Sequence, residues 1–229
     1  NAANSGVDTD GNNSAGLTLA QGALTDGYIV VGVSMYDPVV SASITAVTYG
    51  GTPMTLLGTV QDANAYTEVY LFGLAVGTKA AGNYTVALTG STGIDQLVFG
   101  VSAFSGVNQT ASTGVFASAT GWDTTPSVNV SSAAGDVVVD VLSQDSGTSS
   151  VGANQTQNWK QEDSTDRTDG GSSRETATGA TTTMSHTKTV SAPWSLGAVA
   201  LKGGGPPAGD TTPPTITSVT AVNATTVQV

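Results

Sequence analysis

Oxygen-bearing side chains near the start of the sequence are spaced to bind a hard cation. Asp8, Asp10 and Asn12 occupy alternate positions around Gly11, and such a loop can wrap Ca²⁺ with carboxylate and amide oxygens. No bidentate Glu follows downstream, so a solvated polar arm explains the same residues. The sequence leaves both interpretations open, and Ca²⁺ is the one cofactor that it suggests.

A second acidic cluster lies in the C-terminal half. Asp163, Asp166 and Asp169 recur at every third position beside Glu162, a spacing that suits one shared Ca²⁺ less well than alternation does. Arg167 lies among these carboxylates and can pair with them. The alternatives are therefore a second calcium site and a solvated charge cluster.

The residue types that most enzymes use for catalysis are scarce. The chain has no Cys, and its only His, His186, lies in a Thr-rich segment without a second imidazole to share a zinc ion. The stretch from Gly100 to Phe104 fails to complete the Gly-x-Ser-x-Gly elbow of a serine hydrolase. Few Glu are available for the paired carboxylates of a glycosidase. We therefore expect a protein that is not an enzyme.

Aromatic side chains suggest a different function, the binding of polysaccharide. Trp122 and Trp159 are candidates to stack on sugar rings, as aromatic residues do in many β-sandwich modules. Ordinary packing at the rim of a sheet is the alternative for both. Trp194 alternates with Leu196 and Ala198 on one face of an apolar run, which predicts a buried position for this third Trp.

Asn-x-Ser/Thr triplets, the acceptors for N-linked glycans, are more frequent than the composition alone explains. We expect Asn83, Asn108 and Asn154, which lie in turn-like contexts, to be at the surface and to carry glycans if the source glycosylates such sites. The triplets begin at Asn12, Asn83, Asn108, Asn129, Asn154 and Asn223.

Composition and charge exclude several partners. Among 229 residues, 6 Lys and Arg stand against 17 Asp and Glu, and the formal net charge of −11 repels nucleic acid and anionic lipid. No apolar run approaches the roughly 20 residues of a membrane-spanning helix, and no basic and apolar leader stands at the start. Only 10% of the residues are charged, while Gly, Ser and Thr abound. Such a hydroxyl-rich chain is typical of secreted proteins, and we expect an extracellular or cell-surface location.

Short β-type segments separated by turn residues dominate the chain, and no window has the 3.6-residue period of a helix. The run from Ile94 to Phe104 predicts a central strand with one apolar face and one mixed face, and both faces need a covering layer. Its natural partners are the runs Tyr28 to Tyr36, Asp136 to Leu142 and Trp194 to Leu201. The strands recur roughly every ten residues, which favours an all-β fold, an antiparallel two-sheet jelly-roll sandwich.

Three segments carry a resemblance to a known kind of module. They are Val47 to Leu56 (VTYGGTPMTL), Ala103 to Thr110 (AFSGVNQT) and Ser191 to Ala198 (SAPWSLGA). The chain from about Leu17 to Lys202 resembles a poorly characterised jelly-roll module of large secreted and surface proteins of prokaryotes. The segment from Asp210 to Val219 is similar to the opening of bacterial immunoglobulin-like repeats. The resemblance implies a surface or adhesive role and no catalytic residues.

We expect four regions along the chain: a polar arm over residues 1–16, a sandwich over 17–202, a Gly/Pro linker over 203–214 and an extended β tail over 215–229. The tail is too short to bury its apolar residues in a domain of its own, so it requires the edge of an outside sheet. Strand donation to a neighbouring subunit and the beginning of a following immunoglobulin-like domain both fit this pattern. The apolar tail residues are Ile216, Val219, Val222, Val227 and Val229.

The sequence thus predicts a non-catalytic extracellular structural protein, a subunit of a pilus-like filament or an adhesin that assembles head to tail with itself. Because the donor and acceptor surfaces differ, such contacts need not close into a ring. The alternative function, from a different class, is a carbohydrate-binding module of a secreted enzyme, with polysaccharide as the partner.

Overall fold

The computed structural model consists of antiparallel β-strands, with no helix among the described residues. The prediction of an all-β, antiparallel sandwich fold is therefore confirmed, whereas the jelly-roll type of sandwich stays a prediction. The predicted tail and most of the linker lie outside the described residues. The described residues are 2–8, 14–36, 42–64, 66–91, 94, 96–162 and 169–204.

The strands of the N-terminal half form two sheets, which we call sheets I and II. Sheet I contains, in spatial order, β2 (Ser14–Gln21), β8 (Gly82–Gly90), β4 (Ile44–Tyr49) and the short β5 (Thr52–Pro53). Sheet II contains, in spatial order, β1 (Ala2–Asp8), β9 (Gln96–Phe104), β3 (Leu24–Tyr36), β7 (Glu68–Lys79) and β6 (Thr55–Gln61).

The C-terminal half forms two more sheets, III and IV. Sheet III contains, in spatial order, β10 (Ala117–Asp123), β17 (Ala192–Leu201), β12 (Val137–Gln144), β15 (Asp169–Thr176) and β14 (Thr156–Glu162). Sheet IV contains, in spatial order, β11 (Ser127–Ser131), β16 (Thr181–Lys188) and β13 (Ser149–Val151). The expectation of two sheets was therefore too low, because the described residues form four.

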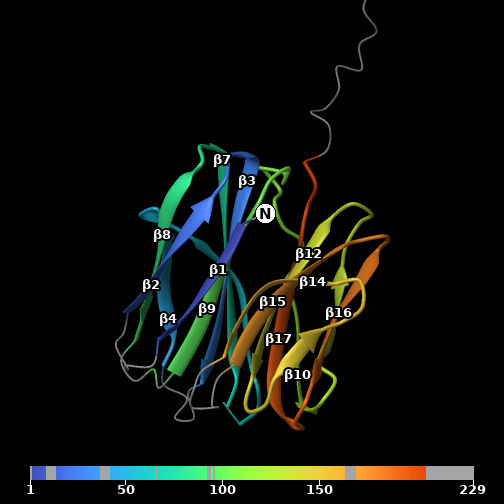
Figure 1. Cartoon of the computed structure of the whole chain (residues 1–229). Coiled ribbons are helices and arrows are strands. Elements are labelled where there is room, and N and C mark those ends of the chain that lie inside the picture. The colour runs from blue at the N-terminus through green and yellow to red at the C-terminus, as the bar shows by residue number, and fades with distance from the viewer. Residues whose placement is uncertain are drawn as a thin grey trace, which may run out of the picture.

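The four sheets stack as layers in the order I, II, III, IV, since each neighbouring pair encloses a cluster of buried apolar side chains. The N-terminal sandwich, blue to green in Figure 1, lies beside the C-terminal sandwich, yellow to orange. The central strand β9 has its apolar face toward sheet I and its mixed face toward sheet III. Both of its faces are covered, as the sequence predicts, but the second cover is another sandwich.

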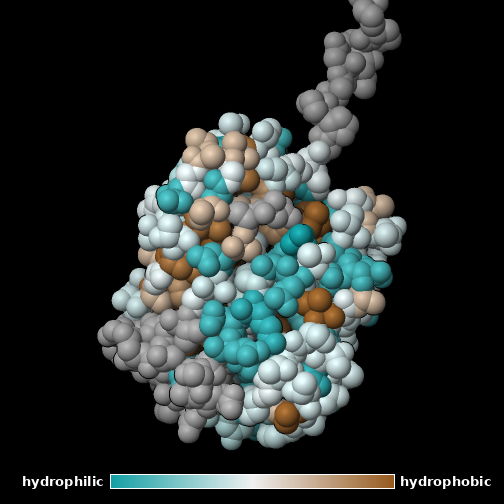
Figure 2. All heavy atoms as spheres, viewed as in Figure 1, coloured by the Kyte–Doolittle hydropathy of each residue, from teal (hydrophilic) through white to brown (hydrophobic). Residues whose placement is uncertain are grey.

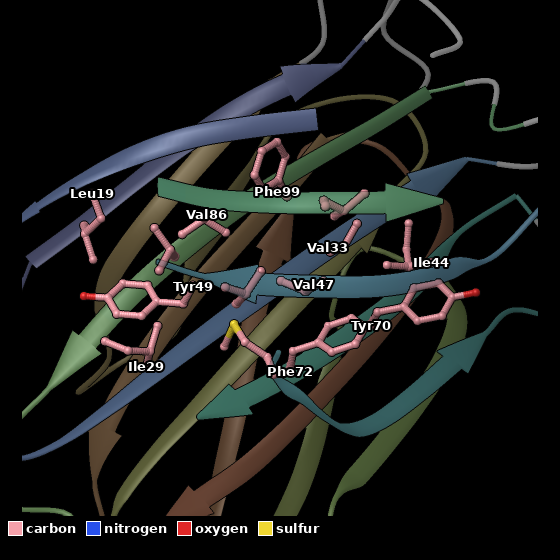
Figure 3. Packing of buried hydrophobic residues seen from close by; sticks show 14 of the residues in the cluster. Leu19, Ile29, Val33, Ile44, Val47, Tyr49, Tyr70, Phe72, Val86 and Phe99 are labelled. Carbon is pink, nitrogen blue, oxygen red and sulfur yellow. The ribbon is translucent and has the colours of Figure 1, made fainter. Parts of the chain in front are cut away.

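The first sandwich shows why the apolar residues of sheets I and II alternate along their strands. Figure 3 shows Leu19, Tyr49 and Val86 of sheet I gathered with Ile29 and Phe99 of sheet II in one core. Each of these side chains is 0 or 1% exposed. Burial of such side chains stabilises a fold by roughly 1.5–3 kcal/mol each, so this core is a large part of the stability of the N-terminal half.

A tight hairpin with Gly50 and Gly51 at its turn joins β4 and β5. The two glycines have φ angles of 57° and 80°, values that a residue with a Cβ rarely adopts. Thr48 pairs with Pro53 and Tyr49 with Thr52 on either side of the turn. The turn therefore depends on glycine at both positions.

The strands of the two sandwiches follow the same spatial order. If the short β5 is left aside and the strands of each half are counted along the chain, both inner sheets run first, eighth, third, sixth, fifth. Both outer sheets run second, seventh, fourth, with β5 added beyond β4 in sheet I. The chain therefore contains two copies of one topology, packed against each other through their equivalent inner sheets.

Corresponding residues face each other where sheets II and III meet. Gly100 of β9 pairs with Gly32 of β3, and Gly197 of β17 pairs with Val141 of β12, which aligns the two halves residue by residue. In this alignment Ser34 corresponds to Ser143, and the Oγ of Ser34 donates to the Oγ of Ser143 at 2.8 Å. Contact between equivalent residues is what a two-fold axis produces, so the halves are related by an approximate two-fold rotation.

Glycines of sheet II leave room for aromatic rings of the second sandwich. A Cβ on Gly100 would come within 2.3 Å of the ring of Trp159, which β14 supplies. A Cβ on Gly58 of β6 would come within 2.3 Å of the ring of Phe116, which precedes β10. The interface between the sandwiches is thus a tightly packed, interdigitated core, and the two halves form one block.

Part of the predicted polar arm over residues 1–16 forms β-strands. β1 pairs with β9 along its whole length, from Ala2 opposite Ala103 to Asp8 opposite Leu97, and β2 already begins at Ser14. An edge strand needs backbone hydrogen bonds on one side only, so its side chains can stay polar. The polar composition therefore conceals a strand.

Candidate functional site

A buried carboxylate lies in the middle of the second sandwich. β12 directs Val139 and Val141 toward sheet II, so the alternation of the strand directs Asp140 toward sheet IV, where it is 0% exposed. His186 of β16, also buried, places its Nε2 atom 2.8 Å from the Oδ2 atom of Asp140. A buried charge requires such partners, because no water solvates it.

The other oxygen of this carboxylate accepts hydrogen bonds from β15. The backbone N–H of Ser173 donates to Oδ1 of Asp140 at 2.6 Å, and the Ser173 hydroxyl donates to the same atom at 3.0 Å. Ser173 is itself 0% exposed. Asp140 therefore ties the middle strand of sheet III to both β15 and β16.

Gln155 completes the cluster from the turn that precedes β14. Its Nε2 atom lies 2.6 Å from the Oγ of Ser173 and 3.5 Å from Oδ2 of Asp140. Its Oε1 atom accepts hydrogen bonds from the backbone N–H of Ser185 at 2.8 Å and from the Ser185 hydroxyl at 3.3 Å. A hydroxyl, a carboxylate and a polarised carboxamide are thus in direct contact. We call Asp140, Gln155, Ser173, Ser185 and His186 the Asp140 cluster.

The first sandwich has no such cluster at the equivalent positions. Val31 corresponds to Asp140 and is buried in the apolar core. β8 is the strand equivalent to β16, and its Val86 and Leu88 are buried in the same apolar core. Two copies of one topology therefore differ in chemistry, since one core is apolar where the other holds an acid and an imidazole.

The pocket next to the imidazole of the Asp140 cluster is small. The pocket beside His186, which Trp159 and Ser172 also line, has a volume of about 10 Å³. This space holds at most about one water molecule.

An aromatic cluster spans the two sandwiches at the surface. Trp122 of β10 is 58% exposed, and its ring meets Tyr66 edge-on at a centroid distance of 6.5 Å. Tyr66 in turn stacks on Tyr36 at 6.2 Å, with 21° between the ring planes. The indole is thus held by a strand and supported by a second ring, which leaves it available to an external partner.

A buried lysine lies near the same end of sheet III. The Nζ atom of Lys188 donates to the carbonyl oxygens of Ala192 and Pro193 at 2.6 and 3.0 Å. Burial lowers the pKa of Lys188 to about 8, although the carboxylates of Asp123 and Asp145 oppose this shift. Lys188 therefore holds the first two residues of β17, and its side chain is buried in the protein.

An open pocket of about 690 Å³ lies where the chain leaves the second sandwich. Lys202 at its rim donates to Oδ2 of Asp136 at 2.9 Å. Burial raises the pKa of the Asp136 carboxyl. The bond from Lys202 and the backbone N–H groups of Ala133 and Gly203 have a larger effect in the opposite direction, so the pKa of Asp136 lies below its usual value. The lining combines apolar and polar side chains, which include Phe104, Val107, Val137, Leu201, Asn154, Thr156, Arg174, Glu175, Thr176, Thr178 and Lys202.

The outer surface is poor in charge and in large apolar patches. On the face in Figure 2, teal and white residues cover most of the described surface, and the brown areas are separate. Among the described residues the exposed large hydrophobic side chains are Leu56, Val115, Trp122 and Val190. Trp122 alone among these four carries an aromatic ring.

Trp159, proposed from the sequence for sugar stacking together with Trp122, is the wrong candidate. It is 5% exposed, and its ring fills the space over Gly100 between the two sandwiches. Trp122 keeps an exposed ring, and Trp194 is buried at 5% as predicted. The sequence pattern near Trp159 is too polar to reveal that a second sandwich covers this strand.

Neither predicted calcium loop is assembled among the described residues. The side chain of Asp8, together with Asp10, Asn12, Asp163 and Asp166, lies outside them. Asp169 is described and is 4% exposed in β15, with Gln144 Nε2 3.4 Å from its Oδ2. The described part holds no group of three or more His, Cys, Asp or Glu arranged for a metal ion. Calcium binding by this chain stays a prediction.

The candidate glycosylation sites differ in accessibility. Asn83, Asn129 and Asn154 are exposed, and Asn154 has a φ of 65° in the turn before β14. Asn108 is half-buried, and its Oδ1 atom accepts the N–H of Thr110 at 2.9 Å within its own turn. Asn12 and Asn223 lie outside the described residues. The predicted surface position thus holds best for Asn83 and Asn154.

The residues of the Asp140 cluster were not found from the sequence, apart from His186 as an isolated imidazole. One signal was present, because Asp140 interrupts the apolar run from Val137 to Leu142 at an inward position. Ser173, Gln155 and Ser185 belong to polar segments and carry no such signal.

Comparison of the chain with models of known protein families, with curated proteins and with solved structures finds no match. In the part of the chain that the structure describes, no helix is long and apolar enough to cross a membrane.

Proposed function

We propose that the chain is a non-catalytic structural subunit of an extracellular surface assembly, a filament or an adhesin, and that its subunits join by strand addition. The observation that supports this proposal is an open sheet edge in the second sandwich. A sheet edge with free backbone groups accepts a strand from another chain. The rigid block of two sandwiches and its hydroxyl-rich surface suit such a building unit.

The open edge belongs to β16. On one side β11 pairs with it from Thr181 to Ser185. On the other side β13 pairs only with His186 to Lys188, so no described strand lies beside Thr181 to Met184. β13 has 3 residues, whereas β4, the equivalent strand of sheet I, has 6. About half of β16 therefore has no neighbouring strand at this edge of sheet IV among the described residues.

The predicted donor is the tail after the Gly/Pro linker. The last described residue, Gly204, donates its N–H to the carbonyl of Gly106 at 2.7 Å, at the end of the block where β9 and β17 finish. The residues that follow leave from this end. In this proposal the strand around Ile216 and Val219 of one subunit pairs with β16 of the next, and repetition gives a head-to-tail polymer.

Removing residues 215–229 tests the proposal. We expect the full chain to form fibres or large oligomers in electron microscopy and light scattering. The shortened chain is expected to stay a folded monomer, because the sandwiches keep their own cores. Fibres of unchanged length from the shortened chain would contradict strand donation by this segment.

A matched pair of substitutions at Thr183 tests the acceptor edge. His186 and Ser132 make backbone bonds on the β11 side of β16, so the alternation of a strand turns the N–H of Thr183 to the open side. Thr183→Pro removes that N–H without breaking a bond to β11, and is expected to prevent assembly. Thr183→Ala keeps the N–H and is expected to assemble normally.

The exposed Trp122 favours a second candidate function, the binding of polysaccharide. Trp122 is 58% exposed and its ring meets Tyr66 edge-on, and an exposed aromatic ring of this kind can serve as a platform for a sugar ring. A carbohydrate-binding module and an adhesin that grips a glycan surface both use such a platform.

Affinity electrophoresis in gels that contain soluble polysaccharides tests this second function. We expect Trp122→Ala to weaken any retardation about tenfold, since a stacked ring contributes up to about 1.5 kcal/mol. Trp122→Phe should keep part of the binding, and Val190→Ala serves as a control at another exposed apolar residue. Equal retardation of the Trp122→Ala variant and the unchanged protein would contradict polysaccharide binding through Trp122.

A further inference from the structure

We propose that the Asp140 cluster forms a covalent cross-link, an ester between the hydroxyl of Ser173 and the side-chain carbonyl of Gln155, with release of ammonia. The reaction takes place once, between groups of the same chain. It needs neither a substrate nor a cofactor, and it is compatible with a non-catalytic protein. The inference holds whichever partner the surface binds.

The nucleophile is in place. The Oγ of Ser173 lies 2.6 Å from the Nε2 of Gln155, which is one bond away from the carbon to be attacked. The same hydroxyl donates to Oδ1 of Asp140 at 3.0 Å, so a carboxylate is ready to accept its proton. Ser173 and Asp140 are both 0% exposed, so little water competes with the hydroxyl.

The electrophile is polarised at its oxygen. Oε1 of Gln155 accepts hydrogen bonds from the N–H and the hydroxyl of Ser185 at 2.8 and 3.3 Å. Two donors at this oxygen stabilise the negative charge that forms there when the carbonyl is attacked. The β13–β14 turn and β16 therefore supply the two sides of an acyl-transfer site.

The steps balance without another reactant. Asp140 takes the proton of the Ser173 hydroxyl while the Oγ electron pair forms a bond to Cδ of Gln155, and the carbonyl electron pair moves to Oε1. When the carbonyl re-forms, the bond between Cδ and Nε2 breaks. Nε2 takes the proton back from Asp140, whose Oδ2 lies 3.5 Å away, and leaves as ammonia. The product is the Ser173–Gln155 ester.

His186 is a positioning residue in this scheme. Its Nε2 atom holds Oδ2 of Asp140 at 2.8 Å, which directs Oδ1 to the Ser173 hydroxyl. Ammonia is lost to the solvent past Gln155, which is only partly buried, so the reverse reaction is not favoured. The ester links the β13–β14 turn to β15, directly beside the open edge of β16.

The intact mass of the full chain tests the proposal, with the protein produced in a host that does not glycosylate. Ester formation lowers the mass by about 17 Da, the mass of ammonia, from that of the 22.6 kDa polypeptide. Ser173→Ala should lose no ammonia. Ser172→Ala removes the neighbouring buried hydroxyl, which accepts from Asn158 instead, and should lose ammonia like the unchanged chain.

Peptide mapping locates the bond. Trypsin cuts after Lys160 and Arg167, so Gln155 and Ser173 lie on separate peptides unless an ester joins them. We expect one joined pair, which hydroxylamine in denaturant separates. His186→Leu should slow the mass loss, and His186→Gln, which can still donate to Asp140, should restore part of the rate. An unchanged mass of the full chain, or an ammonia loss that maps to other residues, would overturn the proposal.

Discussion

Replacing Trp159 by alanine is expected to lower the free energy of unfolding by about 3–5 kcal/mol. The ring is 95% buried, because only 5% of the residue is exposed, and it lies over Gly100 and Gly32 in the interface between the sandwiches. No nearby backbone can move in to fill the space that the ring leaves. Urea-induced unfolding, followed by tryptophan fluorescence and circular dichroism, measures the change.

Trp122→Ala is the matched control for this experiment. The same side chain is removed, but from a position that is 58% exposed, so the expected change is within about 0.5 kcal/mol. If the two variants lose equal stability, Trp159 does not fill the interface in the way described. A variant of Trp159 in which the two halves unfold in separate transitions would show in addition that this ring couples them.

Asp140→Val is expected to cost about 3–5 kcal/mol, because it leaves buried polar groups without their acceptor. His186, the Ser173 N–H and the Ser173 hydroxyl all lose a hydrogen bond to this carboxylate. Valine is the residue at the equivalent position of the first sandwich, so its size and β preference suit the strand. Thermal and urea unfolding measure the loss.

A double-mutant cycle separates the pair from the rest of the cluster. His186→Leu alone leaves the buried Asp140 without its imidazole partner, whereas the combination of Asp140→Val and His186→Leu makes both positions apolar, like the core of the first sandwich. We expect the double variant to be more stable than the sum of the two single losses by about 1–3 kcal/mol. Additive losses would show that the two side chains do not interact.

Much of the strand content could be predicted from the sequence, because alternation reports one buried face. The predicted runs at Tyr28 to Tyr36, Asp136 to Leu142 and Trp194 to Leu201 correspond to β3, β12 and β17. The mixed face of β9 also predicted a second covering layer, which sheet III provides. In these strands the two faces differ enough in polarity for the pattern to be visible.

Strands with polar or glycine-rich sequences were not predicted, for two physical reasons. β1 is held by backbone bonds to β9, which any sequence can make. β15 buries Gly170 and Ser173, and small residues are needed there because a Cβ on Gly170 would meet Val98 at 2.6 Å. The tight packing of two sandwiches selects small residues, and small residues look like a loop in the sequence.

The Asp140 cluster could not be predicted because its members are distant in sequence and come from three strands and a turn. Asp140 and His186 are 46 residues apart and meet only when β12 and β16 face each other across the second core. Gln155 reaches the cluster because β13 stops after Val151 and the chain turns at Asn154, where φ is 65°. Such a meeting depends on the register of two sheets, which local patterns do not determine.

The near two-fold relation of the sandwiches does not force the two halves to have the same core residues. In a dimer of identical subunits, every substitution occurs twice, so a polar group cannot enter one core without entering the other. Here both halves belong to one polypeptide, and each can diverge alone while the Ser34 and Ser143 contact persists between them. One half has Val31 in an apolar core, and the other has Asp140 with its polar hydrogen-bond partners at the corresponding position. Because one polypeptide contains both halves, each core can have its own set of residues while the two halves stay packed together.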